Sequence, residues 1–175
     1  MMDNIYRWVA NTARELQVQA PVLEVGSYNV NGSIRELFPT PYTGMDIRPG
    51  EYVDVVGDVM THESPSRFNT IVCCETLEHL RLPWKAVERM GRWLEPGGYL
   101  IVTVPFMHPI HDFPSDYYRF SGEGLKVLFE EAGLTHVCSH SDAEASYELI
   151  RQDQNSATAF VGEGVFRTTY GVARR

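Results

Sequence analysis

Short apolar runs alternate with segments of helical periodicity along most of the chain. The runs that predict buried strands are rich in β-branched or aromatic residues and lie at 22–25, 42–47, 52–56, 68–74 and 99–104. Helical spacing of apolar positions predicts helices over 3–18, 33–38 and 83–94. Because strands that alternate with helices form βαβ units, we expect a mostly parallel sheet.

The C-terminal part continues this pattern less regularly. Ser121 is a suitable cap for a helix that ends near Ala132, with Gly133 as its stop. Two further strands are expected at 134–139 and 168–173. The predicted fold is a Rossmann-like, doubly wound α/β sheet of seven strands, parallel except for an antiparallel last strand, with helices on both faces.

Length and charge narrow the class of protein. With 175 residues, we expect a single domain over 1–175, with an N-terminal helical segment at 1–19, a lid-like loop at 105–120 and an insertion at 141–163. The net charge of −8 disfavours bulk nucleic acid or an anionic membrane as a partner. The three cysteines form no disulfide framework and are typical of a reducing, cytoplasmic protein.

Polar residues follow the predicted strands at the edge where ligands bind a parallel sheet. Glu24 and Gly26 end the first strand, and a glycine there lets backbone N–H groups approach a ligand. Asp46 ends the second strand, where an acid can accept hydrogen bonds from both ribose hydroxyls. Asp58 and Val59 follow the third strand, where they could hold and cover an adenine. The pattern therefore predicts an adenosine-containing ligand.

Glu24 distinguishes between two classes of adenosine cofactor. NAD binding uses the pattern G-x-G-x-x-G, whereas this loop contains only Gly26 and Gly32. A carboxylate at position 24 would repel a pyrophosphate by about a few kcal/mol, and it would attract an ammonium or sulfonium group. We therefore expect S-adenosylmethionine, with S-adenosylhomocysteine as the product.

Five segments, in order, resemble the class I S-adenosylmethionine-dependent methyltransferases of the type 11 kind. They are residues 23–27, 42–46, 57–59, 68–80 and 94–100. One position departs from the family pattern, because Tyr28 stands where a second glycine is common. The resemblance implies the fold described above and the transfer of a methyl group.

The resemblance also implies which residues would contact the cofactor. They are Glu24, Gly26, Ser27, Asp46, Ile47, Asp58, Val59 and Glu75. Glu24 would meet the methionine ammonium group, Asp46 the ribose and Asp58 the adenine amino group. Ile47 and Val59 would lie against the adenine, although core packing explains an apolar residue at either position equally well.

Methyl transfer from a sulfonium is an in-line displacement, so a base is needed only if the acceptor arrives protonated. His79 and His111 are the candidate catalytic bases, because imidazole titrates near neutrality. His79 and Glu78 could instead pack against or cap the helix that begins near Pro83.

The segment 105–120 resembles a substrate lid of some of these methyltransferases, which implies that His108, Tyr117 and Arg119 contact the acceptor. Alternatively, Asp116 and Arg119 form a pair that fixes the loop. A metal site at His108, His111 and Asp112 is disfavoured, because Pro109 disrupts a regular helix and no fourth ligand is evident. We expect no metal.

A small-molecule acceptor, methylated at oxygen or nitrogen, fits the acidic charge and the short loops. Such an open acceptor site could be completed by a second copy of the chain or by a partner subunit. The altered loop at 28–31 favours a different hypothesis, a binding or scaffolding module without catalysis. The three acids Glu24, Asp46 and Asp58 favour the enzyme, and Glu24 disfavours an NAD-dependent oxidoreductase.

Overall fold

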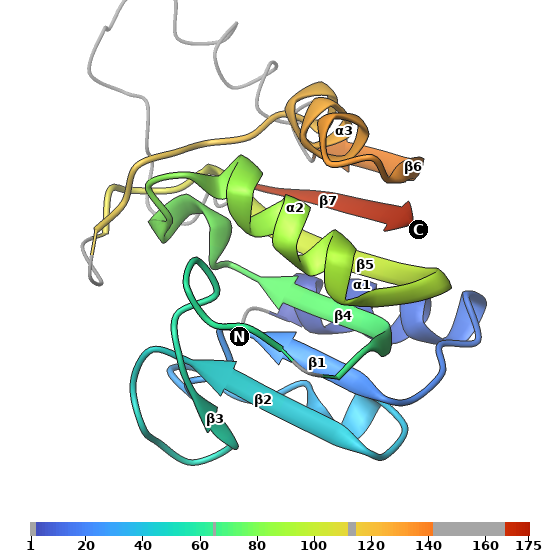
Figure 1. Cartoon of the computed structure of the whole chain (residues 1–175). Helices are drawn as coiled ribbons and strands as arrows, with labels where there is room; N and C mark the ends of the chain where they lie inside the picture. Colours follow the sequence, from blue (N-terminus) through green and yellow to red (C-terminus); the bar gives the residue numbers. More distant parts are fainter. Residues whose placement is uncertain (1–2, 65, 112–114, 142–166) are drawn as a thin grey trace, which may run out of the picture.

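The computed structural model of the chain describes residues 3–64, 66–111, 115–141 and 167–175. In these ranges, strands build one seven-stranded sheet in the order β3-β2-β1-β4-β5-β7-β6 (Figure 1). The strands are β1 (Val22–Val25), β2 (Tyr42–Asp46), β3 (Val55–Val56), β4 (Phe68–Cys74), β5 (Leu94–Met107), β6 (Thr135–Ser141) and β7 (Arg167–Arg174). Neighbours from β3 to β5 are parallel, and β7 is antiparallel to β5 and β6. The predicted fold class is confirmed.

The strand order reverses between β1 and β4. From β1 the chain moves outward to β2 and β3, and it then returns to the other side of β1 to form β4. The arrowheads of β1, β2 and β4 point the same way in Figure 1. In open α/β sheets, this reversal leaves a crevice beyond the carboxyl ends of the two strands. The fold therefore positions a ligand site where the sequence predicts one.

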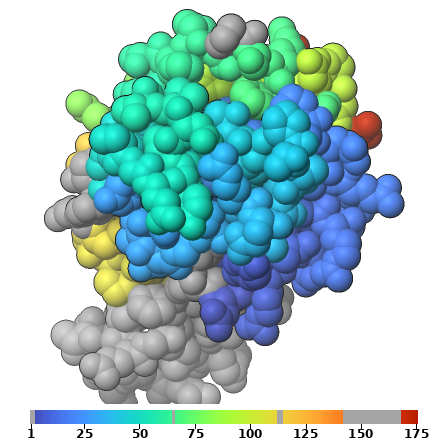
Figure 2. Space-filling model, turned by 90° about the horizontal axis from the view of Figure 1, so that it is seen from below, coloured from blue at the N-terminus to red at the C-terminus, as the bar shows by residue number. Residues whose placement is uncertain are grey.

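Helices cover both faces of the sheet (Figure 1). They are α1 (Asp3–Glu15), α2 (Pro83–Trp93) and α3 (Gly122–Glu131), with two single-turn 3-10 helices, η1 (Arg35–Leu37) and η2 (Leu77–His79). Ile5 and Val9 of α1 join the core on one face, and Met90 of α2 and Phe129 of α3 join the core on the other. In the view of Figure 2, the N-terminal half of the chain, coloured blue to teal, forms most of the coloured surface that faces the reader.

Local signals placed the ends of several elements correctly. The Ser121 side chain accepts a hydrogen bond from the Gly124 backbone N–H at 3.1 Å and caps α3, and Gly133 adopts a φ of +74° after its last turn. Pro83 occupies the first turn of α2, where its missing N–H costs nothing. None of the helices in the described ranges combines the length and the apolar character needed to cross a membrane.

Other predicted strand ends are wrong, because pairing between neighbouring strands sets where a strand begins and ends. β5 begins at Leu94 rather than at residue 99, because the Leu94 backbone already pairs with Phe68 of β4. It continues to Met107 because β7 pairs with it from Tyr99 to Met107, so the loop that follows begins later than position 105. β3 contains only two residues. The insertion expected at 141–163 lies outside the described residues except for Ser141.

Candidate functional site

A cavity of about 360 Å³ lies at the carboxyl ends of β1, β2 and β4. It brings together every predicted cofactor-contacting residue and the three histidines proposed for the acceptor side. These residues are Glu24, Gly26, Ser27, Asp46, Ile47, Asp58, Val59, Glu75, His79, His108 and His111. Tyr117 and Arg119 lie outside this cavity and line a neighbouring hollow, to which His108 also contributes.

Glu24 is a buried acid on this cavity, with 6% of its surface exposed. Its Oε2 accepts a hydrogen bond from the Tyr42 hydroxyl at 2.8 Å. Burial raises the pKa of Glu24 to about 7, although the Tyr42 hydrogen bond opposes that shift. The group therefore titrates near neutral pH, and a cationic ligand would favour its ionised form.

The turn after β1 requires a glycine and leaves one hydroxyl without a partner. Gly26 adopts a φ of +87°, and a Cβ atom there would lie 2.0 Å from Thr76 Oγ1. The N–H groups of Gly26 and Ser27 both donate to the Met45 carbonyl, at 2.8 and 3.1 Å. Ser27 Oγ is buried and has no hydrogen-bond partner within the described part of the chain. Since Ser27 lines the cavity, a polar ligand group can satisfy this hydroxyl.

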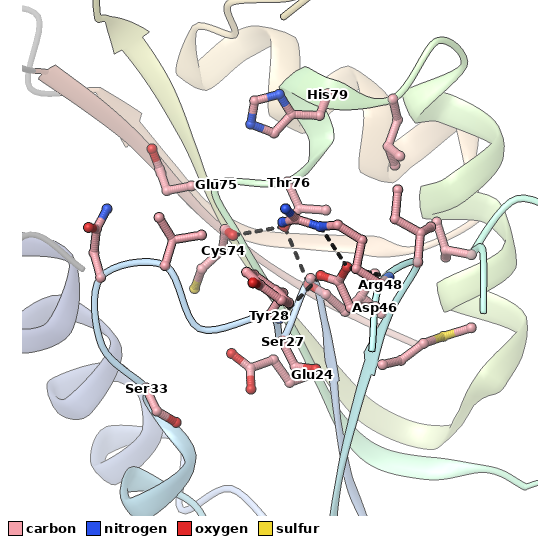
Figure 3. Close-up of a pocket in the computed structure, with 18 of the residues that line it drawn as sticks. Glu24, Ser27, Tyr28, Ser33, Asp46, Arg48, Cys74, Glu75, Thr76 and His79 are labelled. Atoms are coloured by element: carbon pink, nitrogen blue, oxygen red, sulfur yellow. Dashed lines mark hydrogen bonds and ion pairs between the residues drawn. The ribbon is translucent and has the colours of Figure 1, made fainter. Parts of the chain in front are cut away.

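Asp46 organises the loop in which Tyr28 replaces the common glycine. Its Oδ2 accepts from the Tyr28 backbone N–H at 3.2 Å, and its Oδ1 accepts from the Arg48 backbone N–H at 3.0 Å. The Arg48 guanidinium lies 3.9 Å from the centroid of the Tyr28 ring (Figure 3). Each carboxylate oxygen keeps a second lone pair for a ligand hydroxyl. Sequence reasoning missed this stacked pair; an arginine two residues after the acid was the available signal.

The three residues predicted to contact the adenine of the cofactor, Ile47, Asp58 and Val59, all line the cavity. Ile47 is 52% exposed and lines the cavity, so core packing does not explain it. Val59 is buried in the core and also lines the cavity, so it serves both purposes. Asp58 Oδ1 accepts from the Met60 backbone N–H at 2.8 Å, which fixes the turn after β3. One Asp58 oxygen is thus engaged in turn formation.

Two acids follow β4 in the loop that enters η2. Glu75 Oε1 accepts from Thr103 Oγ1 at 2.9 Å, and burial raises the pKa of Glu75 to about 7. Glu78 is completely buried, and neither carboxyl oxygen has a hydrogen-bond partner among the described residues. Burial and the nearby Glu75 raise the pKa of Glu78 well above its usual range. Nothing in the pattern of residues around position 78 predicts this burial.

His79 extends into the cavity from η2, as Figure 3 shows. Its Nδ1 lies 2.6 Å from the Ser115 carbonyl, which can only accept, so Nδ1 carries the proton. Burial lowers the pKa of His79 and favours the neutral ring, with a lone pair on Nε2. His79 does not cap α2, because Leu82 is the cap residue and no side chain caps it. The His111 ring packs edge-on against the His79 ring, with 5.0 Å between the two ring centroids.

Asp116 and Arg119 form the pair that sequence analysis offered as an alternative to substrate binding. Arg119 donates to both carboxylate oxygens of Asp116, at 2.5 and 2.7 Å, and the Asp116 side chain is only 1% exposed. The guanidinium holds the pKa of Asp116 well below its usual range. Asp116 Oδ2 also accepts from the His111 backbone N–H at 3.0 Å. This pair therefore fixes the loop that carries His111.

We expect Asp116→Asn to destabilise the protein by about 2 kcal/mol, because it weakens charge-assisted hydrogen bonds and leaves Arg119 without its counter-charge. Urea unfolding at pH 7 measures this loss. Glu63→Gln is the control, because Glu63 also binds an arginine but is 84% exposed in its side chain. It should change the free energy of unfolding by less than about 0.5 kcal/mol. Equal losses in the two variants would contradict a structural role for Asp116.

Comparison with known proteins gives concordant matches. A family model described as a methyltransferase domain matches residues 3–139. A ubiquinone biosynthesis O-methyltransferase of Paracidovorax citrulli is 36% identical over 53 residues, which are 30% of this chain and 22% of that protein. The match to this curated relative thus spans less than a quarter of its length.

Solved structures resemble the whole chain. The 1,6-didemethyltoxoflavin-N1-methyltransferase of Burkholderia thailandensis, solved with 1,6-didemethyltoxoflavin and S-adenosylhomocysteine, has a TM-score of 0.70 at 18% identity, covering 97% of this chain and 77% of that one. The N-methyltransferase NodS of Bradyrhizobium japonicum has a TM-score of 0.63 at 17% identity, covering 100% of this chain and 99% of that one. At these identities, the similarity establishes the fold.

Proposed function

The chain belongs to the class I S-adenosylmethionine-dependent methyltransferases, and from this premise we propose that it methylates a small-molecule acceptor at oxygen or nitrogen. The observation that carries this proposal is the single cavity in which acids suited to the cofactor and histidines suited to the acceptor lie together. The acidic net charge of −8 supports a small molecule over nucleic acid.

The residues of the cavity fit the cofactor. When bound, S-adenosylmethionine supplies an electrophilic methyl group on a sulfonium. We assign Glu24 to its ammonium group, because a buried carboxyl with a pKa of about 7 gains a counter-charge there. We assign Asp46 to the ribose hydroxyls. Ile47, Asp58 and Val59 are assigned to the adenine end of the cofactor. The unpartnered Ser27 hydroxyl would gain a hydrogen bond from the ligand.

The acceptor would enter between η2 and the loop after β5. His79 and His111 line this part of the cavity, and either could accept a proton from a protonated acceptor. His79 suits that role, because burial favours its neutral form. Tyr117 and Arg119 would contact only the part of an acceptor that reaches the neighbouring hollow. The names of the relatives support small acceptors, since they refer to ubiquinone biosynthesis and to 1,6-didemethyltoxoflavin.

Cofactor binding should raise the melting temperature by about 5–10 °C at a ligand concentration near one hundred times Kd, because such binding adds about 2.7 kcal/mol. We expect this rise with S-adenosylmethionine and S-adenosylhomocysteine, and none with NAD. Thermal shift measurements with the three ligands check the result. A rise with NAD alone, or with none of the three in folded protein, would contradict the assignment of the cavity.

Labelled methyl groups test the acceptor class. Purified protein is incubated with methyl-labelled cofactor and either the small-molecule or the macromolecular fraction of a cell extract. Label in the small-molecule fraction is expected. Label only in macromolecules would overturn the acceptor proposal, and cofactor binding without any transfer would favour the non-catalytic alternative. Gel filtration in the same buffer reports whether the chain forms oligomers, which completion of the site by a second copy requires.

We propose a reducing, cytoplasmic compartment, and the state of the cysteines supports it. Cys73 and Cys74 are buried free thiols, and Cys138 is an exposed one. Burial raises the pKa of Cys73 and Cys74, so both are poor nucleophiles and act as core side chains. Free thiols support our expectation of a reducing, cytoplasmic compartment.

A further inference from the structure

Three possible metal ligands meet beside the acceptor part of the cavity. Glu78, His79 and His111 each offer one ligand atom, and these atoms lie within 4.8 Å of one another. Ligand atoms of a tetrahedral zinc ion with bonds of ~2.1 Å are about 3.4 Å apart. Shifts of about an ångström would therefore bring all three onto one ion. Glu78 and His79 come from η2, whereas His111 comes from the loop after β5.

Both histidines are oriented as metal ligands usually are. The Nδ1 proton of His79 is donated to the Ser115 carbonyl, which leaves the Nε2 lone pair for a ligand. His111 Nδ1 lies 3.2 Å from the Pro109 carbonyl and 3.1 Å from Asp116 Oδ2, both acceptors, so its Nε2 is the available nitrogen. Hydrogen bonds of this kind fix the tautomer and the ring orientation of metal-bound histidines.

Glu78 gives an independent reason for a cation at this place. Its side chain is 0% exposed, and neither oxygen accepts a hydrogen bond from the described residues. Its Oε1 lies 3.5 Å from His79 Nε2, so a carboxylate lone pair faces an imidazole lone pair. Two acceptors in this arrangement repel each other unless a cation or a proton lies between them.

Two acids and one arginine act on Glu78. The charged groups that act on Glu78 are the acids Glu75 and Asp116 and the guanidinium of Arg119. Arg119 is already held by both oxygens of Asp116. The guanidinium is therefore engaged elsewhere, and a cation at Glu78 would supply a partner that this buried carboxyl lacks among the described residues.

We propose that Glu78, His79 and His111 bind one divalent transition-metal ion of the zinc class. Two imidazoles and one carboxylate are a ligand set that zinc uses, and the remaining coordination position would face the cavity. The sequence suggested His108, His111 and Asp112 as the only metal candidates and disfavoured them. The fold instead joins His111 to η2, and Asp112 lies outside the described residues.

The position of the ion deepens the proposed function, and its role in catalysis rests on that function. His79 and His111 line the cavity where the acceptor would enter, so an acceptor oxygen could occupy the open coordination position. A bound cation lowers the pKa of a coordinated hydroxyl, whose proton would pass to water. The acceptor oxygen would then form a bond to the methyl carbon while the bond from that carbon to the sulfonium sulfur breaks, which leaves S-adenosylhomocysteine. The two histidines would then act as ligands rather than as proton acceptors, and the preferred acceptor would be a hydroxyl compound.

Metal binding is tested on tag-free, chelator-treated protein without cofactor or acceptor, so a failure here is separate from a failure of the proposed function. Equilibrium dialysis with Zn²⁺ is expected to give one ion per chain, and Co²⁺ should give visible absorption bands of a four- or five-coordinate site. Glu78→Gln and His111→Ala should each weaken Zn²⁺ binding at least about tenfold. Glu78→Gln keeps the shape of the buried side chain, and circular dichroism checks that both variants fold.

His108→Ala is the matched control, because the His108 ring lies 4.6 Å from His111 but belongs to no cluster of three ligands among the described residues. It should retain wild-type affinity. Wild-type protein that binds no Zn²⁺ at micromolar concentration would overturn the proposal. Full binding by Glu78→Gln, with loss in His108→Ala, would overturn it as well, since the ion would then sit on the loop histidines alone.

Discussion

Gly26→Ala is expected to destabilise the protein by about 2–4 kcal/mol and to abolish cofactor binding. Two effects add at this position. A φ of +87° strains any residue with a Cβ atom, and that atom would lie 2.0 Å from Thr76 Oγ1. Because the Gly26 and Ser27 N–H groups share the Met45 carbonyl, the strain would also displace these three residues, which line the cavity. Urea unfolding and thermal shift with S-adenosylhomocysteine measure the two losses.

Gly133→Ala is the control that separates the cost of a positive φ from the cost of a steric clash. Gly133 also has a positive φ, +74°, but a Cβ atom there would meet nothing within 4 Å. This variant should lose only about 1 kcal/mol, the cost of the backbone conformation, and should bind the cofactor normally. If both variants lost the same free energy and Gly26→Ala still bound the ligand, the close packing of the β1 turn on Thr76 would be irrelevant to the site.

Glu24→Gln is expected to weaken S-adenosylhomocysteine binding about ten- to hundredfold at pH 8 while making the free protein more stable. The loss of affinity follows from removing a charge-assisted contact to the ligand ammonium group. The gain in stability follows from removing a carboxyl that must ionise while buried. The substitution changes affinity and stability in opposite directions, because the buried carboxylate stabilises the bound ligand and destabilises the free protein.

The pH dependence gives the sign of the stability effect. Burial raises the pKa of Glu24 from 4.5 to about 7, so between these values the folded protein binds the proton more tightly than the unfolded chain does. The contribution of Glu24 to the free energy of unfolding therefore falls as pH rises from 4.5 to 7, by up to about 3 kcal/mol. Glu75, whose pKa burial also raises to about 7, contributes in the same direction.

Urea unfolding of wild type and Glu24→Gln at several pH values between 4 and 8 measures this difference. The two proteins should have similar stability near pH 4 and diverge above it, with the variant more stable. Affinity of the wild type for S-adenosylhomocysteine should rise between pH 6 and 8, because the ligand binds the ionised form. Glu88→Gln, an exposed acid paired with Arg92, should leave both profiles unchanged. Parallel profiles for wild type and Glu24→Gln would contradict the buried, titrating carboxyl.

The order and type of most elements, and the residues at the strand ends, could be predicted from the amino-acid sequence. Hydrophobic periodicity and the caps at Ser121 and Gly133 are local properties, so they can be interpreted without knowledge of the fold. The positions of Glu24, Asp46 and Asp58 at the ends of successive strands also indicated where the ligand site lies. Parallel strands bring their carboxyl ends to one edge, so this spacing is sufficient to predict that the acids share a cavity.

Tertiary structure alone decided features that depend on contacts between distant segments. The two ends of β5 follow from its pairing with β4 at Leu94 and with β7 up to Met107, and the stacking of Arg48 on Tyr28 follows from the approach of two loops. The burial of Glu78 and its proximity to His111 also depend on contacts with segments distant in the sequence, such as the hydrogen bonds of Ser115 and Tyr117 with η2. Periodicity and motif spacing describe neighbours along the chain, whereas burial and side-chain convergence are set by packing across it.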